Sequence, residues 1–201
     1  MNAAAVYVVD DDPSIRDATA LFLGLHGIPT RLFESGESFL AVAGPEAVGC
    51  LLLDLKMAGI GGIEVQKELV RRGSLLRVVV MTAHGDVPTT RDALIGGAID
   101  FLEKPVEHTQ LLETVRRAMA SSIDAGQRVT EKADWQQRVA RLTSRELEIM
   151  RLLVKGLQNR EIASTLGISA RTVEVHKARI LDKLGLERPA DLIRFGLAHS
   201  G

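Results

Sequence analysis

The chain has 201 residues, which is room for one large domain or two ordinary ones. An apolar fraction of 46% and a charged fraction of 25% predict a folded core and exclude a disordered chain. No apolar run reaches the roughly 18 residues of a membrane span, and Asp10 follows Met1 too closely for a signal peptide, so we expect a cytoplasmic protein without membrane contact. The single cysteine, Cys50, excludes a disulfide framework and a multi-cysteine zinc site.

The net charge of −1 conceals an asymmetry between the two halves of the chain. Residues 1–120 carry a charge of −5, whereas residues 121–201 carry +4. A basic second half indicates an anionic partner such as nucleic acid, although this signal is weak when taken alone.

Residues 1–120 alternate short apolar runs with amphipathic stretches. The apolar runs cover 6–9, 30–33, 50–53, 78–81 and 101–102, and the amphipathic stretches cover 15–25, 39–42, 63–69, 89–95 and 111–119. Strands with nearly continuous apolar character, each followed by a helical pattern, are typical of a parallel sheet with helices on both faces. The sequence therefore predicts a doubly wound α/β domain with five parallel strands.

Residues 121–138 are polar and charged, with one tryptophan at position 135. We interpret them as a linker, and their alternating charges favour a partly helical one. Trp135 is expected to pack between the domains.

Residues 139–201 show only helical patterns, separated by clear start and stop signals. Thr143 and Glu146 form a capping box before the first helix, and Gly156 marks its end. A second helix covers 160–166, Ser169 caps a third that ends before Gly185, and Pro189 opens a fourth. The sequence therefore predicts a small all-α domain of four helices.

Acidic residues lie where the first and third predicted strands end. Asp10, Asp11 and Asp12 follow the first strand, and Asp54 follows the third. Ligands of an open parallel sheet bind outside the carboxyl ends of its strands, and clustered carboxylates there favour a hard divalent cation, most naturally Mg²⁺. Asp12 precedes Pro13, so we interpret it as a helix N-cap and leave it outside the metal site.

A carboxylate beside such a metal can act as a nucleophile toward phosphorus. Asp54 is our candidate, because it ends the central strand and stands alone. Thr82 and Lys104 end the fourth and fifth strands, where the hydroxyl and the ammonium group would contact phosphoryl oxygens.

Four segments resemble the signatures of the response-regulator receiver domain. They are Val8 to Pro13, Leu53 to Met57, Met81 to Gly85 and Phe101 to Pro105. The resemblance implies a flavodoxin-like fold in which a sensor histidine kinase phosphorylates Asp54. It also implies that Asp10, Asp11, Asp54 and the Lys56 carbonyl surround Mg²⁺, that Thr82 and Phe101 switch together, and that Lys104-Pro105 is a cis peptide.

One departure from the receiver pattern lies just after the phosphoacceptor. Where such receivers often have Met-Pro, this chain has Met57-Ala58, followed by the glycine-rich residues 59–62. We expect a more mobile loop with the acidic site intact. Lys56 and His84 occupy positions that tune phosphoryl lifetime in the family.

The third helix of the second domain has two distinct faces. Spacing at 100° per residue places Val173, Ile180 and Leu184 on a buried face. The opposite face carries Arg171, Glu174, Val175, Ala178, Arg179 and Asp182. A Val-Ala pair among charges suits thymine methyls in a major groove, and Glu174 could accept a hydrogen bond from cytosine. Phosphate contacts are expected from a basic set: Arg160, Arg171, Lys177 and Lys183.

Residues 142–146, 156–163 and 172–176, together with Lys183-Leu184, resemble the LuxR-type helix-turn-helix. Thr172 lies in this motif and joins the expected DNA-binding residues. With the receiver ahead of it, the chain resembles two-domain response regulators of the NarL/FixJ family. The resemblance implies double-stranded DNA as a partner, a homodimer when phosphorylated, and RNA polymerase as a further candidate partner.

Three other functions compete with this interpretation. A phosphatase of the haloacid-dehalogenase type carries a second aspartate two residues after its nucleophile, but Lys56 stands there, and no phosphate-binding loop for nucleotide hydrolysis exists. We therefore expect no enzyme. A receiver that works without phosphorylation is disfavoured by the complete acidic set. Activation by release of a covered third helix, in place of dimerisation, stays open.

Overall fold

The computed structural model describes residues 4–83 and 87–198. The chain forms two compact units that divide between Gln127 and Arg128. Among the helices within those ranges, none combines the length and the apolar character needed to cross a lipid bilayer.

The first unit is a five-stranded sheet with the strand order β2-β1-β3-β4-β5, in which every pairing is parallel. The strands are β1 (Ala5–Val9), β2 (Thr30–Phe33), β3 (Gly49–Asp54), β4 (Arg77–Ala83) and β5 (Asp100–Lys104). The helices between and after them are α1 (Pro13–Leu25), α2 (Gly36–Val42), α3 (Gly62–Arg71), α4 (Val87–Ile95) and α5 (His108–Val139). This architecture confirms the predicted doubly wound α/β fold.

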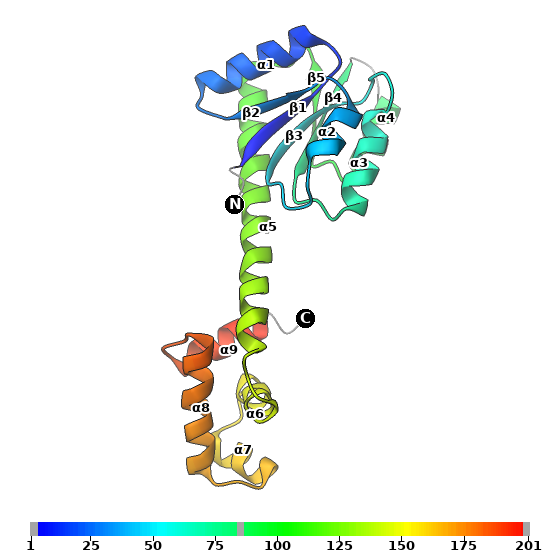
Figure 1. Ribbon diagram of the computed structural model, residues 1–201. Coiled ribbons are helices and arrows are strands. Elements are labelled where there is room, and N and C mark those ends of the chain that lie inside the picture. The colour runs from blue at the N-terminus through cyan, green and yellow to red at the C-terminus, as the bar shows by residue number, and fades with distance from the viewer. Residues whose placement is uncertain (1–3, 84–86, 199–201) are drawn as a thin grey trace. The chain divides into compact units, whose positions relative to one another are not determined.

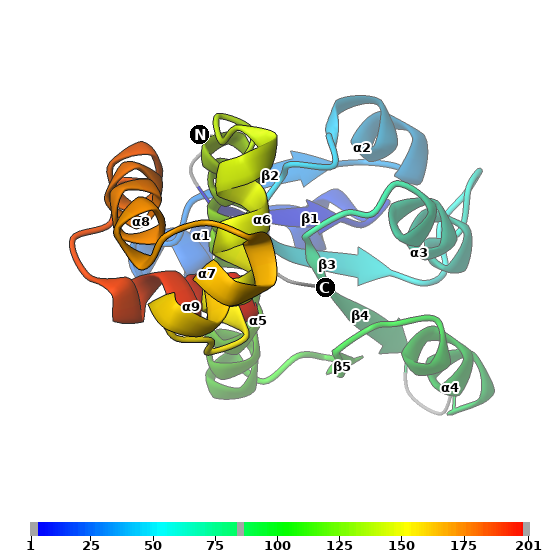
Figure 2. The same ribbon diagram turned by 90° about the horizontal axis from the view of Figure 1, so that it is seen from below.

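Helices cover both faces of the sheet, as Figure 2 shows for the first unit. On one face, Leu23 of α1 and Val115 of α5 pack on strand residues such as Val8 and Leu52. On the other face, α2, α3 and α4 supply the apolar layer. Because both faces are buried, the central strand β3 and its neighbour β1 are almost uniformly apolar, which explains the continuous apolar runs in the sequence.

The strand register aligns the carboxyl ends of four strands. Val9 pairs with Leu53, Asp54 with Met81, and Ala83 with Lys104. The residues that follow β1 and those that end β3, β4 and β5 therefore gather at one edge of the sheet.

Helix α5 runs without interruption through residues 121–138, so the segment interpreted as a linker is helical throughout (Figure 1). Its first part belongs to the first unit. The fully buried Ser122 accepts a hydrogen bond from the Gly49 N–H at 2.8 Å and donates one to the Leu75 carbonyl at 2.7 Å. Its last turns belong to the second unit, where the Trp135 ring stacks on Phe195 with centroids 5.6 Å apart. Trp135 thus packs on residues of the second unit.

The second unit adds four helices to the end of α5, as predicted. They are α6 (Ser144–Val154), α7 (Asn159–Leu166), α8 (Ala170–Leu184) and α9 (Pro189–Ala198). The expected capping box of Thr143 and Glu146 is present, Ser169 caps α8, and Gly167 and Gly185 end α7 and α8 with φ of 65° and 66°. Helix α8 packs against α6 and α7, and α9 packs against α6.

Candidate functional site

Three aspartates meet at the carboxyl edge of the sheet. Asp10 and Asp11 follow β1, Asp54 ends β3, and one carboxylate oxygen from each lies within 4.8 Å of the others. Asp10 is fully buried and Asp54 is 8% exposed, whereas Asp11 is open to solvent. Burial raises the pKa of the Asp10 carboxyl, because its charged form has lost its water. The arrangement therefore needs a positive charge beside it.

Lys104 supplies that charge. It ends β5, and its Nζ lies 2.7 Å from Oδ2 of Asp10 and 2.6 Å from Oδ2 of Asp54. Burial by itself would lower the pKa of Lys104, but its hydrogen bonds and charge interactions with the two carboxylates outweigh burial and raise it. The ammonium group is thus protonated at neutral pH and bridges the two buried carboxylates. The Lys104-Pro105 peptide is cis, as expected.

Backbone groups fix the other carboxylate oxygens. Oδ1 of Asp54 accepts a hydrogen bond from the Lys56 N–H at 3.0 Å, and Oδ1 of Asp10 accepts one from the Asp12 N–H at 3.0 Å. Each carboxylate therefore has one oxygen held by backbone and one oxygen turned to Lys104.

Asp12 caps α1 and lies outside the acidic cluster, as predicted. Its side chain accepts a hydrogen bond from the Ser14 N–H at 2.8 Å, and Pro13 occupies the first helical position. Sequence reasoning missed Arg16, one turn into the same helix, whose Nη1 donates to the Asp10 carbonyl at 2.7 Å. Its place one turn after the aspartates was the only available signal.

The two residues to which the resemblance assigns a switch role differ in exposure. Thr82 lies in β4 and is 5% exposed, whereas Phe101 lies in β5 and is 42% exposed. Phe101 thus places a large apolar side chain at the surface. His84 lies outside the described residues.

The second unit presents the face that the sequence assigned to DNA. Val173, Ile180 and Leu184 of α8 are fully buried, which confirms the predicted core face of this helix. The other predicted residues of α8 are exposed apart from the half-buried Lys177 and Lys183: Arg171, Thr172, Glu174, Val175, Ala178 and Arg179. Thr172 also joins the helix cap, since its Oγ1 lies 2.8 Å from Oγ of Ser169.

Lys183 has a partner inside the protein. Its Nζ lies 2.6 Å from Oε2 of Glu146, whose side chain is only 4% exposed. The same Glu146 oxygen accepts a hydrogen bond from the Thr143 N–H at 2.8 Å. The sequence assigned Lys183 to a phosphate contact, whereas in the structure its ammonium group is paired with a carboxylate of α6.

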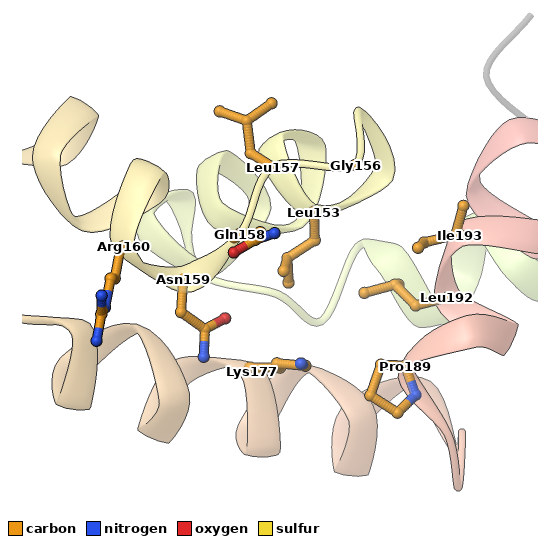
Figure 3. A pocket seen from close by; sticks show the side chains of 10 residues that line it. All are labelled: Leu153, Gly156, Leu157, Gln158, Asn159, Arg160, Lys177, Pro189, Leu192 and Ile193. Carbon is orange, nitrogen blue, oxygen red and sulfur yellow. The ribbon is translucent and has the colours of Figure 1, made fainter.

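A cavity of about 490 Å³ opens beside α8, between the α6–α7 connection and α9 (Figure 3). Its floor is apolar, with Leu153 and Leu192 buried, and Arg160 and Lys177 belong to its polar lining. The Lys177 side chain runs along α8 toward Pro189. Arg160 of α7 and Lys177 of α8, two of the residues expected to contact phosphate, thus lie beside the same cavity.

Family comparisons agree with the two units. The family described as "Response regulator receiver domain" matches residues 6–116, and the family described as "Bacterial regulatory proteins, luxR family" matches residues 140–195.

Curated relatives match along nearly the whole chain. The transcriptional regulatory protein FixJ of Azorhizobium caulinodans is 38% identical over 192 residues, covering 96% of this chain and 91% of the relative. The transcriptional regulatory protein TdiR of Thauera aromatica is also 38% identical, covering 96% and 86%. The tetrathionate response regulatory protein TtrR of Salmonella typhimurium is 39% identical, covering 95% and 91%.

Solved structures show the same similarity. The response regulator StyR matches with a TM-score of 0.85 and 36% identity, covering 96% of this chain and 97% of StyR. Full-length FixJ from B. japonicum matches with a TM-score of 0.60 and 34% identity, covering 100% and 98%.

Proposed function

Because the chain belongs to the NarL/FixJ family of two-domain response regulators, we propose that Asp54 accepts a phosphoryl group from a sensor histidine kinase and thereby controls DNA binding. The observation that carries the proposal is the cluster of Asp10, Asp11 and Asp54 with Lys104 bridging two of them. A carboxylate oxygen of Asp54 would attack phosphorus while the bond from phosphorus to the kinase nitrogen breaks. The Lys104 ammonium then faces the phosphoryl oxygens that arrive beside it.

The donor set fits Mg²⁺. Asp10, Asp11 and Asp54 offer carboxylate oxygens, and the Lys56 backbone carbonyl is the proposed fourth protein ligand. Hard oxygen donors in an acidic pocket are the ligands that Mg²⁺ prefers. The bound ion would neutralise phosphoryl oxygens as they approach.

Treatment with acetyl phosphate and Mg²⁺ tests this assignment by intact mass. We expect one phosphoryl group on the wild type, none on Asp54→Asn, and none in the presence of a chelator. Glu103→Gln is the matched control, because it removes an exposed carboxylate from β5 outside the acidic cluster. Phosphate retained by Asp54→Asn would contradict the proposal.

In the second unit we propose a division of labour along α8. Val175, Ala178 and Glu174 would read bases, while Arg160, Arg171, Thr172, Lys177 and Arg179 would hold the DNA backbone. Support comes from the exposure of these side chains, of which Val175 is 46% exposed and only Lys177 is half-buried. Lys183 leaves the set of phosphate contacts, because its charge is paired with Glu146.

Selection from a random DNA library tests base reading. Val175→Ala should change the preferred sequence, whereas Glu148→Ala, at an exposed position of α6 outside the α8 face, should not. An unchanged preference in Val175→Ala would refute the assignment.

Phosphorylation is proposed to promote dimerisation, so that two helix-turn-helix units bind one DNA site. The exposed Phe101 would turn inward with Thr82 and change the surface between about residues 87 and 112. The competing function is release of a covered α8 without dimerisation. Sedimentation and DNA titration of the phosphorylated wild type and Asp54→Asn separate the two, since a monomer that saturates DNA would exclude dimerisation. RNA polymerase is the proposed downstream partner.

A further inference from the structure

The loop between Asp54 and α3 has a sequence that restrains its own backbone only weakly. Residues 57–62 include three glycines, and Ala58 stands where receivers often have proline. Gly59 adopts a φ of 77°, a conformation that suits glycine and costs an ordinary residue free energy. Ordering such a loop costs more conformational entropy than ordering a proline-containing one.

Helix α2 supplies the missing restraint. Oε1 of Glu37, in the first turn of α2, accepts a hydrogen bond from the Ile60 N–H at 2.8 Å. A Cβ atom at Gly59 would lie only 2.4 Å from the same oxygen, so the loop backbone passes directly against the carboxylate. Hydrogen bonds from the N–H groups of Glu37 itself and of Ile60 lower the pKa of this carboxyl, which is therefore charged at neutral pH.

The start of α2 is itself well anchored. Ser35 and Ser38 form a reciprocal capping box around its first turn. A Cβ atom at Gly36 would lie 2.9 Å from the Ile60 carbonyl oxygen and 2.6 Å from Cγ2 of Val65. The helix end thus packs tightly against the loop, and the exposed Glu37 side chain reaches the loop from there.

The other end of the loop contacts the phosphoacceptor. A Cβ atom at Gly62 would lie 2.4 Å from the Asp54 carbonyl oxygen, and the Gly62 N–H donates to the Leu55 carbonyl at 3.2 Å. Only residues 56–61 separate these two fixed points, and Lys56 is the first of them. The Lys56 N–H is already bonded to Oδ1 of Asp54, so a restraint at Ile60 acts on the chain that follows it, starting with the Lys56 carbonyl.

We propose that Glu37 is a positioning residue for the phosphorylation site. Its carboxylate holds the loop of residues 57–62, and through this loop the Lys56 carbonyl. It thereby provides the restraint that a proline at position 58 would otherwise give. This inference rests on the proposed function of Asp54. Glu37 touches neither phosphate nor metal, and its effect passes through the loop backbone.

The first test needs no metal and no phosphodonor. Amide hydrogen exchange at Ile60 should be about fivefold faster in Glu37→Ala than in the wild type, the factor expected for one ordinary hydrogen bond. Glu37→Gln keeps an oxygen that can accept the bond and should lie close to the wild type. Glu34→Ala is the matched control, because Glu34 is an exposed carboxylate just before the α2 cap. Unchanged exchange at Ile60 in Glu37→Ala would overturn the proposal.

The second test separates positioning from general stability. The Mg²⁺ concentration for half-maximal phosphorylation by acetyl phosphate should rise about fivefold in Glu37→Ala, with the rate at saturating Mg²⁺ retained. Adding Ala58→Pro to Glu37→Ala should restore the wild-type Mg²⁺ dependence. An equal rise in Glu34→Ala would assign the effect to charge alone and overturn the positioning role. No phosphorylation of the wild type would overturn the proposed function, while exchange at Ile60 would still decide whether Glu37 holds the loop.

Discussion

Glu146 and Lys183 join the first turn of α6 to the last turn of α8 through an ion pair of 2.6 Å that is closed to water on the carboxylate side. The hydrogen bonds from Lys183 and from the Thr143 N–H lower the pKa of Glu146 to about 2. The position of α8 in the second unit thus depends on a charge that strong acid removes.

Stability of the second unit should therefore fall with acid in a defined pH range. A carboxyl whose pKa is lowered on folding contributes its full stability above its unfolded value near 4.5, and loses it as the pH falls toward about 2. Glu146→Gln should cost about 1–3 kcal/mol at pH 7, and the difference from the wild type should shrink below pH 4.5. Urea unfolding followed by the fluorescence of the single tryptophan, Trp135, measures it. A difference that grows with acid would contradict this account.

The same ion pair predicts an unusual salt dependence of DNA binding. Removal of a phosphate contact lowers the slope of log affinity against log salt by about one counterion, so Arg160→Ala and Lys177→Ala should each do so. Lys183→Met should leave the slope unchanged, because its charge is already paired with Glu146. A slope lowered by about one in Lys183→Met would restore Lys183 to the phosphate contacts.

Mg²⁺ should stabilise one unit and not the other. Cys50 is fully buried in β3, and burial raises the pKa of its thiol, so alkylation should require unfolding of the first unit. At a concentration ten times its dissociation constant, Mg²⁺ should raise the free energy of unfolding of the first unit by about 1.4 kcal/mol, as measured by Cys50 labelling in urea. The transition reported by Trp135 should not move. Asp10→Asn should abolish the Mg²⁺ effect, and an equal shift of both transitions would argue against a specific site.

Ser122 should stabilise the first unit from a residue beyond its predicted boundary. Ser122→Ala leaves the Gly49 N–H and the Leu75 carbonyl without their buried partner, which should cost about 1–3 kcal/mol. Ser121→Ala, which removes only an exposed bond from Arg77, should cost less than about 1 kcal/mol. Urea unfolding followed by Cys50 labelling compares the two variants, and equal losses would show that the buried hydroxyl has no special role.

The acidic site could be predicted because one rule of the fold applies to all its members. Asp10, Asp54 and Lys104 each lie at or just after the end of a strand, and parallel strands bring those ends together. The buried face of α8 was predictable for a similar reason, since its spacing repeats with the helix.

Contacts between distant segments were not predictable in this way. Lys183 and Glu146 are 37 residues apart, and Glu37 and Ile60 are 23 apart, so no local period connects either pair. A helical wheel shows in which direction a side chain points from its own helix, but not which residue of another element it contacts. For the same reason, the expectation of a more mobile loop after Asp54 did not include the hydrogen bond between the Ile60 N–H and Glu37 of α2.

The two hydrogen bonds of the Ser122 hydroxyl also determine where such proteins can be divided into fragments or fused to other domains. The receiver family match ends at residue 116, yet the first unit extends to Gln127 along α5. A fragment or gene fusion cut at residue 120 would discard the hydroxyl that satisfies two buried backbone groups, and with it the contact of Gly126 with Val48. A cut after Gln127 keeps the Ser122 hydrogen bonds and the Gly126 contact. The boundary suited to domain exchange therefore lies in the middle of a helix and not at the end of the family match.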